Sequence, residues 1–132
     1  MLEKTVIPAP ALGLDFAKIF GHHQSPSIRA GNLIFVSGMV AVDPETGERQ
    51  QGTVTAECHR IFKNLKLVLE AAGSSLASIV QIRACIYDRI EYDVLNQVYA
   101  QYLVKEPPAR TVWSVKIETG FKVQLDVIAT VT

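Results

Sequence analysis

Apolar residues recur at spacings of three and four between Thr55 and Ala72, the interval that places side chains along one side of an α-helix. The members of this stripe are Cys58, Ile61, Leu65, Val68, Leu69 and Ala72. Thr53 or Thr55 can cap the start of the helix through its side-chain oxygen, and Gly73 stands where a left-handed residue commonly ends one. The pattern predicts a helix over residues 55–72.

A second helix is predicted from Tyr92 to Val104, where apolar and aromatic residues again recur at helical spacing. Its inward-facing side chains are expected to be Val94, Leu95, Val98, Tyr99 and Tyr102. Pro107 and Pro108 stop the chain from continuing as a helix, because proline lacks the backbone N–H and restricts the residue before it.

Two short apolar segments flank Gly31-Asn32, a residue pair typical of tight hairpin turns, so we expect a hairpin between Ile28 and Ser37. Leu33 to Val36 is a continuous apolar run, and it is predicted to be a buried strand that ends at Ser37-Gly38. The preceding residues 1–27 hold three of the six prolines and indicate an irregular lead-in or an edge strand.

Three further strands are predicted in the second half of the chain. Ile79 to Tyr87 alternates between an apolar and a mixed face, the pattern of a strand with one side in a core. The expected apolar face is Val80, Ile82, Ala84 and Ile86. Thr111 to Ile117 and Lys122 to Val131 are the last two strands, joined by a turn at Thr119-Gly120.

The predicted order is β-β-α-β-α-β-β, an α+β fold in which one mixed sheet carries both helices on the same face. Two helices cover only one face of such a sheet. The other face is expected to hold Arg83, Tyr87, Arg110, Gln124 and Asp126 among apolar residues. It must therefore be solvated, lined by a ligand or packed against another subunit.

Composition narrows the class of protein. A chain of 132 residues fits a single domain over residues 1–132, and 48% hydrophobic with 20% charged residues excludes a disordered or collagen-like chain. Thirteen basic and thirteen acidic residues give a formal net charge of zero, which argues against nucleic acid as a partner.

The N-terminus and the cysteines indicate a cytoplasmic protein. The first residues carry Glu3 and break at Pro8 and Pro10, unlike a signal peptide, and no apolar run reaches the roughly 20 residues of a membrane span. Cys58 and Cys85 have no metal-ligand spacing. The pair His22-His23 lacks a third ligand, and we interpret it as a solvated segment near a subunit boundary rather than a metal site.

Candidate chemistry centres on Pro107-Pro108-Ala109-Arg110-Thr111. Two prolines fix the approach of the chain, so Arg110 at the mouth of a strand is placed to grip a carboxylate through two hydrogen bonds. A structural ion pair is the alternative for this arginine, and Arg83 is a rival anion-binding residue. Asn96 lies near the middle of the second helix, where asparagine is unfavourable unless its amide has a partner.

Together these segments resemble the RidA/YjgF family. The similar stretches are Gly31 to Gly38, Asp43 to Gly47, Asn64 to Leu76, Asn96-Gln97-Val98-Tyr99, Pro107 to Thr111, and Val123 to Ala129. They run in order from about Ser25 to Val131. The resemblance implies a chorismate-mutase-like fold in a homotrimer, whose three sheets form a central barrel with small-carboxylate clefts between subunits.

The activity implied by the resemblance is hydrolysis of a C–N bond. Reactive enamines and imines, such as those derived from 2-aminoacrylate, would become 2-keto acids and ammonia, without a metal or an organic cofactor. Some members of the family are described as ribonucleases, which the neutral charge and the absence of a basic-aromatic run do not favour.

The family's site residues carry over one by one. Arg110 would clamp the substrate carboxylate, Ser37 and Gly38 would line the pocket, and Asn96 would shape it. Three positions depart from the deaminase pattern: Gln24 stands for a tyrosine, Val112 for a cysteine, and Gln124 for a glutamate that orients the attacking water.

Gln124 is the departure that divides the possible functions. A carboxamide can hydrogen-bond a water but cannot act as a carboxylate base at neutral pH. Asp126 lies two residues on, on the same strand face, and is a possible substitute. Two functions therefore stay open: an imine or enamine deaminase, and a trimer that binds a small carboxylate or keto acid with little or no catalysis.

Overall fold

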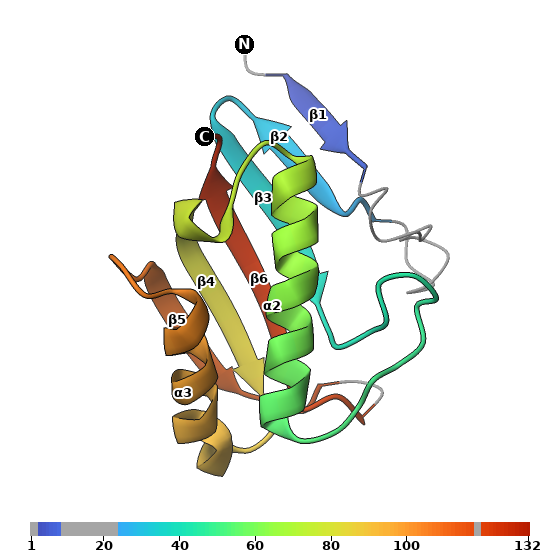
Figure 1. Cartoon of the computed structure of the whole chain (residues 1–132), viewed down its shortest axis with the longest axis vertical. Coiled ribbons are helices and arrows are strands. Elements are labelled where there is room, and N and C mark those ends of the chain that lie inside the picture. The colour runs from blue at the N-terminus through green and yellow to red at the C-terminus, as the bar shows by residue number, and fades with distance from the viewer. Residues whose placement is uncertain (1–2, 9–23, 118–119) are drawn as a thin grey trace.

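The computed structural model describes residues 3–8, 24–117 and 120–132. In these residues a six-stranded mixed sheet carries two α-helices on one face (Figure 1). The strands, in the order in which they lie side by side, are β1 (Lys4–Ile7), β2 (Ser27–Ala30), β3 (Leu33–Met39), β6 (Val123–Thr130), β4 (Ile79–Ile86) and β5 (Ala109–Ser114). The helices are α2 (Val54–Ala71) and α3 (Tyr92–Tyr102), with short 3-10 turns η2 (Leu76–Ser78) and η3 (Arg89–Glu91). The predicted α+β class is confirmed, and the predicted order β-β-α-β-α-β-β is found from β2 onward, with the additional strand β1 before it.

The topology places the strand β6 at the centre of the sheet. It pairs antiparallel with both β3 and β4, while β5 pairs parallel with β4 at one edge. The opposite edge is β1, which confirms the edge-strand interpretation for residues 4–7 of the lead-in. None of the helices in the described residues is long and apolar enough to cross a membrane.

The predicted hairpin is present, but the prediction that Leu33 to Val36 is a buried strand is right only for Ile34 and Val36. Gly31 has a φ of 60° and turns the chain so that Ala30 pairs with Leu33. Leu33 and Phe35 are 38% and 41% exposed, because β3 alternates between a buried and an open side and continues to Met39.

The helix α2 begins and ends through the predicted signals, one residue earlier than expected. The hydroxyl of Thr53 accepts a hydrogen bond from the N–H of Ala56 at 3.1 Å, and Gly73 follows the helix with a φ of 77°. Its apolar side packs on the sheet, and its fully buried members include Ile61, Phe62, Leu65 and Leu69.

A buried carboxylate, Glu57, ties the first turn of α2 to two other segments. Its Oε2 accepts the N–H of Gly52 at 3.1 Å and its Oε1 accepts the N–H of Lys122 at 2.9 Å. The ammonium of Lys122 also donates to the carbonyl of Gly52. These bonds fix the chain directly before β6 begins.

The second helix packs against the first through aromatic rings. Tyr102 stacks on Phe62 with 4.7 Å between ring centroids, and its hydroxyl lies 2.7 Å from Nδ1 of His59. The helix α3 ends at Tyr102, two residues before the predicted Val104. Of the residues predicted to face inward, Leu95, Val98 and Tyr99 are buried, whereas Val94 and Tyr102 are half-buried.

Two strand predictions need correction. Val80 is 44% exposed, because a register irregularity opposite β6 between Ile79 and Gln81 turns it out of the apolar face. The buried residues of β4 are instead Ile79, Ile82, Ala84 and Ile86. The strand β5 ends at Ser114 rather than Ile117. Before β6, Gly120 has a φ of 84°, while Thr119 lies outside the described residues.

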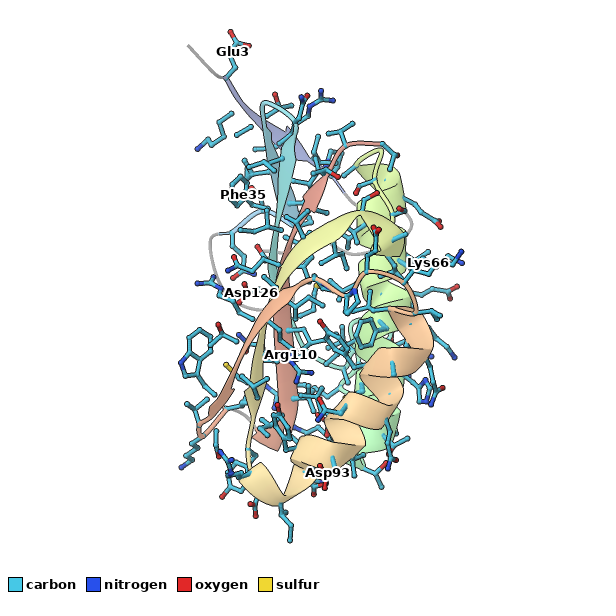
Figure 2. The ribbon with its side chains drawn as sticks, turned by 90° about the vertical axis from the view of Figure 1, so that its left-hand side faces the viewer. Glu3, Phe35, Lys66, Asp93, Arg110 and Asp126 are labelled. Atoms are coloured by element: carbon cyan, nitrogen blue, oxygen red, sulfur yellow. The ribbon has the colours of Figure 1, made fainter. Side chains whose placement is uncertain are left out.

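The placement of Arg110 on the uncovered face is also wrong. Arg110 pairs in register with Ile82, whose side chain is buried beneath the helices, so Arg110 lies on the helix-covered face. Gln124 and Asp126 alternate with buried residues of β6 and do lie on the uncovered face. Figure 2 shows Asp126 and Phe35 on the side of the sheet away from the helices.

Candidate functional site

Arg110 lies between β5 and α3, where its guanidinium contacts two neutral side chains of that helix (Figure 2). Nη1 donates to Oδ1 of Asn96 at 2.7 Å, and Nη2 donates to the hydroxyl of Tyr92 at 2.9 Å. Two aromatic rings flank the same group, with Cζ 4.8 Å from the ring centroid of Tyr99 and 5.5 Å from that of Tyr92. We call Arg110, Asn96, Tyr92 and Tyr99 the arginine cluster.

The helix presents its two acceptors to Arg110 because of their spacing. Tyr92 and Asn96 are four residues apart, so they lie one above the other on the same side of α3. Asn96 therefore has the partner that an asparagine inside a helix needs, and that partner is Arg110. On the other side, the parallel pairing of β5 with β4 holds the backbone of Arg110.

The two arginines differ in how their charge is balanced. Nε of Arg83 donates to Oδ1 of Asp126 at 2.7 Å, and this ion pair raises the pKa of Arg83. Within residues 3–8, 24–117 and 120–132, no carboxylate forms a salt bridge with Arg110. The structural ion pair considered for Arg110 is therefore not present there, and the rival Arg83 already has an anion.

Tyr99 is the most buried member of the arginine cluster, at 7% exposed. Burial raises the pKa of its hydroxyl, and the positive charge of Arg110 offsets part of that rise. The hydroxyl oxygen makes no hydrogen bond with any described residue. Tyr99 is therefore protonated at neutral pH and contributes its ring, rather than a charge, to the surroundings of Arg110.

Val112 lies on the same side of β5 as Arg110, two residues further along. It pairs in register with Ala84, is half-buried and packs against the hydrophobic core. An isopropyl group at this position offers no hydrogen bond to a ligand.

A second group of candidate residues lies on β3 and β6. A Cβ atom built on Gly38 would be only 2.7 Å from Nε2 of Gln124, so the two residues are in close contact. Ser37 precedes Gly38, and its hydroxyl donates to the carbonyl of Ser25 at 2.5 Å. Gln24 is half-buried directly before Ser25. We call Gly38, Ser37 and Gln124 the glutamine cluster.

Cys85 extends the glutamine cluster across the next strand. It pairs in register with Gln124 on β6 and with Trp113 on β5, so these three side chains form one row on the uncovered face. Burial and the nearby charge of Asp126 raise the pKa of the Cys85 thiol, which keeps it protonated at neutral pH.

One chain does not bring the arginine and glutamine clusters together. The arginine cluster lies on the helix-covered side at β5, and Gln124 lies on the uncovered side at β6, with β4 between the two strands. A small ligand on a single chain therefore cannot contact Arg110 and Gln124 at once.

Sequence reasoning missed two members of the arginine cluster. Tyr99 was expected only as a core residue, and Tyr92 only as the start of a helix. The spacing of four between Tyr92 and Asn96 is the available signal, because it puts the hydroxyl on the side of the helix where the amide lies.

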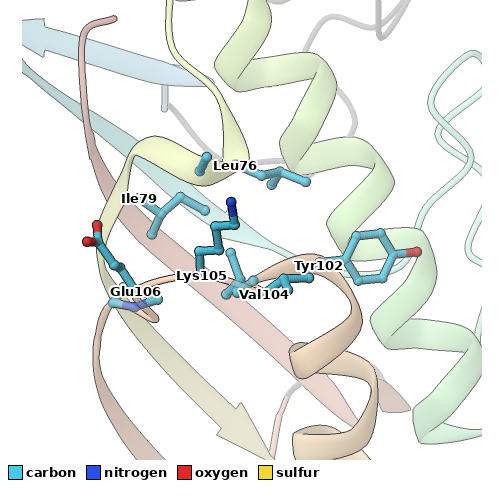
Figure 3. Close-up of a pocket in the computed structure, with 9 residues that line it drawn as sticks. Leu76, Ile79, Tyr102, Val104, Lys105 and Glu106 are labelled. Carbon is cyan, nitrogen blue, oxygen red and sulfur yellow. The ribbon is translucent and has the colours of Figure 1, made fainter.

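Other candidates do not form a site in the part of the chain that the structure describes. No group of three or more His, Cys, Asp or Glu side chains lies there in a position to hold a metal ion. His22 and His23 are outside the described residues. A shallow cavity of about 260 Å³ lies between η2 and the chain after α3 (Figure 3), and none of the predicted site residues lines it.

A comparison against known protein families gives a match over most of the chain. The sequence model of the family described as Endoribonuclease L-PSP matches residues 18–131, and the chain belongs to this family. It is the RidA/YjgF family of the resemblance, which is confirmed.

Relatives in this family carry names that describe reactions. A protein of Arabidopsis thaliana, named Reactive Intermediate Deaminase A, chloroplastic, is 31% identical over 80% of this chain and 57% of its own length. The human 2-iminobutanoate/2-iminopropanoate deaminase is 26% identical over 80% of this chain and 77% of its own length. The crystal structure of RidA from an Antarctic Psychrobacter has a TM-score of 0.78 and 32% identity, covering 82% of this chain and 88% of that one. The family thus includes reactive intermediate deaminases.

Proposed function

We propose that this protein hydrolyses 2-imino acids and their enamine tautomers to 2-keto acids and ammonia. The observation that carries the proposal is the guanidinium of Arg110, held in place by neutral acceptors and without a carboxylate partner among the described residues. The names of the human and Arabidopsis relatives support the same reaction class.

The guanidinium has capacity left for a substrate carboxylate. Arginine has five N–H donors, and the bonds to Asn96 and Tyr92 use two of them, so three remain. A carboxylate accepts two parallel N–H bonds from such a fork, and the charge of the pair is then balanced. Every 2-imino acid carries the carboxylate next to its reactive carbon, so gripping one end orients the other.

Hydrolysis of a 2-imino acid requires little from the protein beyond orienting the substrate and a water molecule. A protonated imine carbon is electrophilic, so a water can add to it, and the resulting amino alcohol releases ammonia to leave the 2-keto acid. Holding the carboxylate and the water in reacting geometry supplies much of the rate. Oε1 of Gln124 can accept a hydrogen bond from that water, but the amide cannot take its proton at neutral pH.

We further propose that the site is completed by a second copy of the chain within a homotrimer. The arginine and glutamine clusters lie on opposite faces of one sheet, so a ligand that contacts both needs the glutamine cluster of a neighbour. The uncovered face offers exposed apolar side chains for packing between copies, among them Leu33, Phe35, Val80 and Trp113. The number three follows from the family resemblance.

A second function is a carboxylate-binding protein with little catalysis. The pairing of Asp126 with Arg83 favours it, because the carboxylate that could replace the missing glutamate already neutralises a cation. In this case Arg110 would still bind a 2-keto acid, and Gln124 would hydrogen-bond the ligand without accelerating a reaction.

A deaminase assay tests the proposal. Amino acids are oxidised enzymatically to 2-imino acids, and imine decay is timed with the wild-type protein, with Arg110→Ala and with Arg89→Ala. Arg89 is an exposed arginine outside both clusters and should leave the rate unchanged. We expect Arg110→Ala to lower kcat/KM about 100-fold, because two charge-assisted hydrogen bonds are lost.

The opposite result would favour the binding function. If no imine decays faster with the wild-type protein, the deaminase proposal fails. Calorimetric titration with pyruvate then decides whether Arg110 still binds a 2-keto acid. Light scattering tests the trimer, which a particle with the mass of a single chain would contradict.

A further inference from the structure

The strongest unassigned feature of the candidate site is the hydrogen bond from Arg110 to Tyr92. The two terminal nitrogens of the guanidinium each donate to a different side chain of α3, at 2.7 Å to Asn96 and at 2.9 Å to Tyr92. Asn96 was expected in the site from the sequence, but the tyrosine hydroxyl was not.

We propose that Tyr92 is a positioning residue that sets the orientation of the Arg110 guanidinium for the substrate carboxylate. The inference rests on the proposed function, since it concerns how tightly the same arginine holds a 2-imino or 2-keto acid. Tyr92 acts through Arg110, so it should affect affinity rather than the chemical step.

The geometry gives the hydroxyl a role that Asn96 alone cannot fill. An arginine side chain has several rotatable bonds before its planar guanidinium. A single hydrogen bond at Nη1 does not by itself fix the orientation of that plane. A second acceptor at Nη2, four residues earlier on the helix, fixes the plane. Each terminal nitrogen then has one N–H group bonded to α3, and three N–H donors remain for a ligand.

The exposure of Tyr92 and the position of its ring are consistent with a hydroxyl that holds Arg110 at the edge of a ligand site. Its side chain is 37% exposed, so it lies at the rim of the arginine cluster rather than in the core. Its ring centroid is 5.5 Å from Cζ of Arg110, which adds an attraction between the cation and the ring. Tyr92→Phe keeps that ring and removes only the hydroxyl group, and with it the acceptor for Nη2.

The test compares Tyr92→Phe with Tyr102→Phe. Tyr102 is on the same helix and its hydroxyl also makes a 2.7 Å contact, but with His59 rather than with Arg110. We expect Tyr92→Phe to raise KM for 2-iminopropanoate, and Kd for pyruvate, about fivefold with kcat unchanged. Tyr102→Phe should leave KM and Kd at the wild-type values.

A second measurement does not depend on any ligand. In protein labelled with ¹⁵N-arginine, a guanidinium fixed at both ends gives separate Nη resonances because rotation about Nε–Cζ is slow. Arg110→Lys assigns the signals. We expect them to broaden or merge in Tyr92→Phe and to persist in Tyr102→Phe.

The outcomes separate this inference from the proposed function. Unchanged affinity and unchanged Nη resonances in Tyr92→Phe would overturn the positioning role, whatever the protein catalyses. A drop in kcat without a change in KM would also overturn it. If the wild-type protein neither turns over imines nor binds pyruvate, while the Nη resonances merge in Tyr92→Phe, the proposed function fails and Tyr92 still orients Arg110.

Discussion

Gly38 and Gln124 lie so close on neighbouring strands that a Cβ atom on the glycine would be 2.7 Å from Nε2 of the glutamine. The contact is between backbone and the far end of a flexible side chain. Gly38 therefore limits where the amide of Gln124 can lie, and in the proposed mechanism that amide orients the attacking water.

Gly38→Ala tests this limit. The added methyl group should push the Gln124 amide aside at a cost of about 1 kcal/mol in unfolding free energy, because the side chain can rotate away. We expect kcat for imine hydrolysis to fall about tenfold as the water loses its orientation. Urea unfolding and the deaminase assay measure the two effects, and an unchanged kcat would remove Gln124 from the reaction.

Gln124→Glu tests whether a missing carboxylate limits the rate. A carboxylate at this position could accept a proton from the attacking water, so we expect kcat to rise about 100-fold at neutral pH. The gain should disappear below about pH 4, where the carboxyl group is protonated. Gln124→Met, with a similar length and no strong acceptor, should lower kcat instead, and a Glu variant no faster than wild type would contradict our account of this position.

Glu57→Gln tests the buried carboxylate that joins α2 to the start of β6. An amide keeps one acceptor oxygen and turns an NH₂ group toward the second backbone N–H, so one of the bonds to Gly52 and Lys122 is lost. We expect the free energy of unfolding to fall by about 2 kcal/mol. Glu70→Gln, an exposed change on the same helix, should stay within about 0.5 kcal/mol of wild type.

The thiol of Cys58 should make the protein less stable in alkali. Burial raises its pKa from an ordinary 9.0 to about 12 in the folded protein. Above pH 9 the unfolded chain loses this proton while the folded chain keeps it, so the free energy of unfolding falls as the pH rises toward 12, by at most ~1.4 kcal/mol per pH unit.

Cys58→Ala isolates that contribution. Tyr99 and Tyr102 also have raised pKa values, so they too lower the free energy of unfolding as the pH rises. The contribution of Cys58 is therefore the difference between the pH profiles of the wild-type protein and the variant. Urea unfolding from pH 7 to 11 should show a flatter alkaline decline in the variant. Parallel declines would show that the thiol of the folded protein ionises like that of the unfolded chain.

Local patterns were sufficient to predict most elements of this fold. The Thr53 cap, the Gly31 turn and the helical stripe of α2 each depend on residues close in sequence, and the structure has all three. The exposed positions of Leu33 and Val80 were missed, because the face to which a strand residue turns depends on its partner strand and on register irregularities.

In the candidate site, too, local sequence features were predicted correctly and features that depend on strand pairing were not. The prolines before Arg110 and the helical position of Asn96 drew attention to two residues that do contact each other. The face of Arg110 was assigned wrongly, because it depends on the parallel register with Ile82. The alternation of residues within β5 does not show how this strand is paired with β4.

The position of β6 between β3 and β4 has a consequence for how the protein is made. Both neighbours leave the ribosome before the strand that joins them, so each has an unpaired backbone edge while synthesis continues. Folding of the sheet must therefore wait until β6 has emerged. During that interval the unpaired edges of β3 and β4 are prone to aggregate, so we expect a chaperone to bind the nascent chain at these two segments.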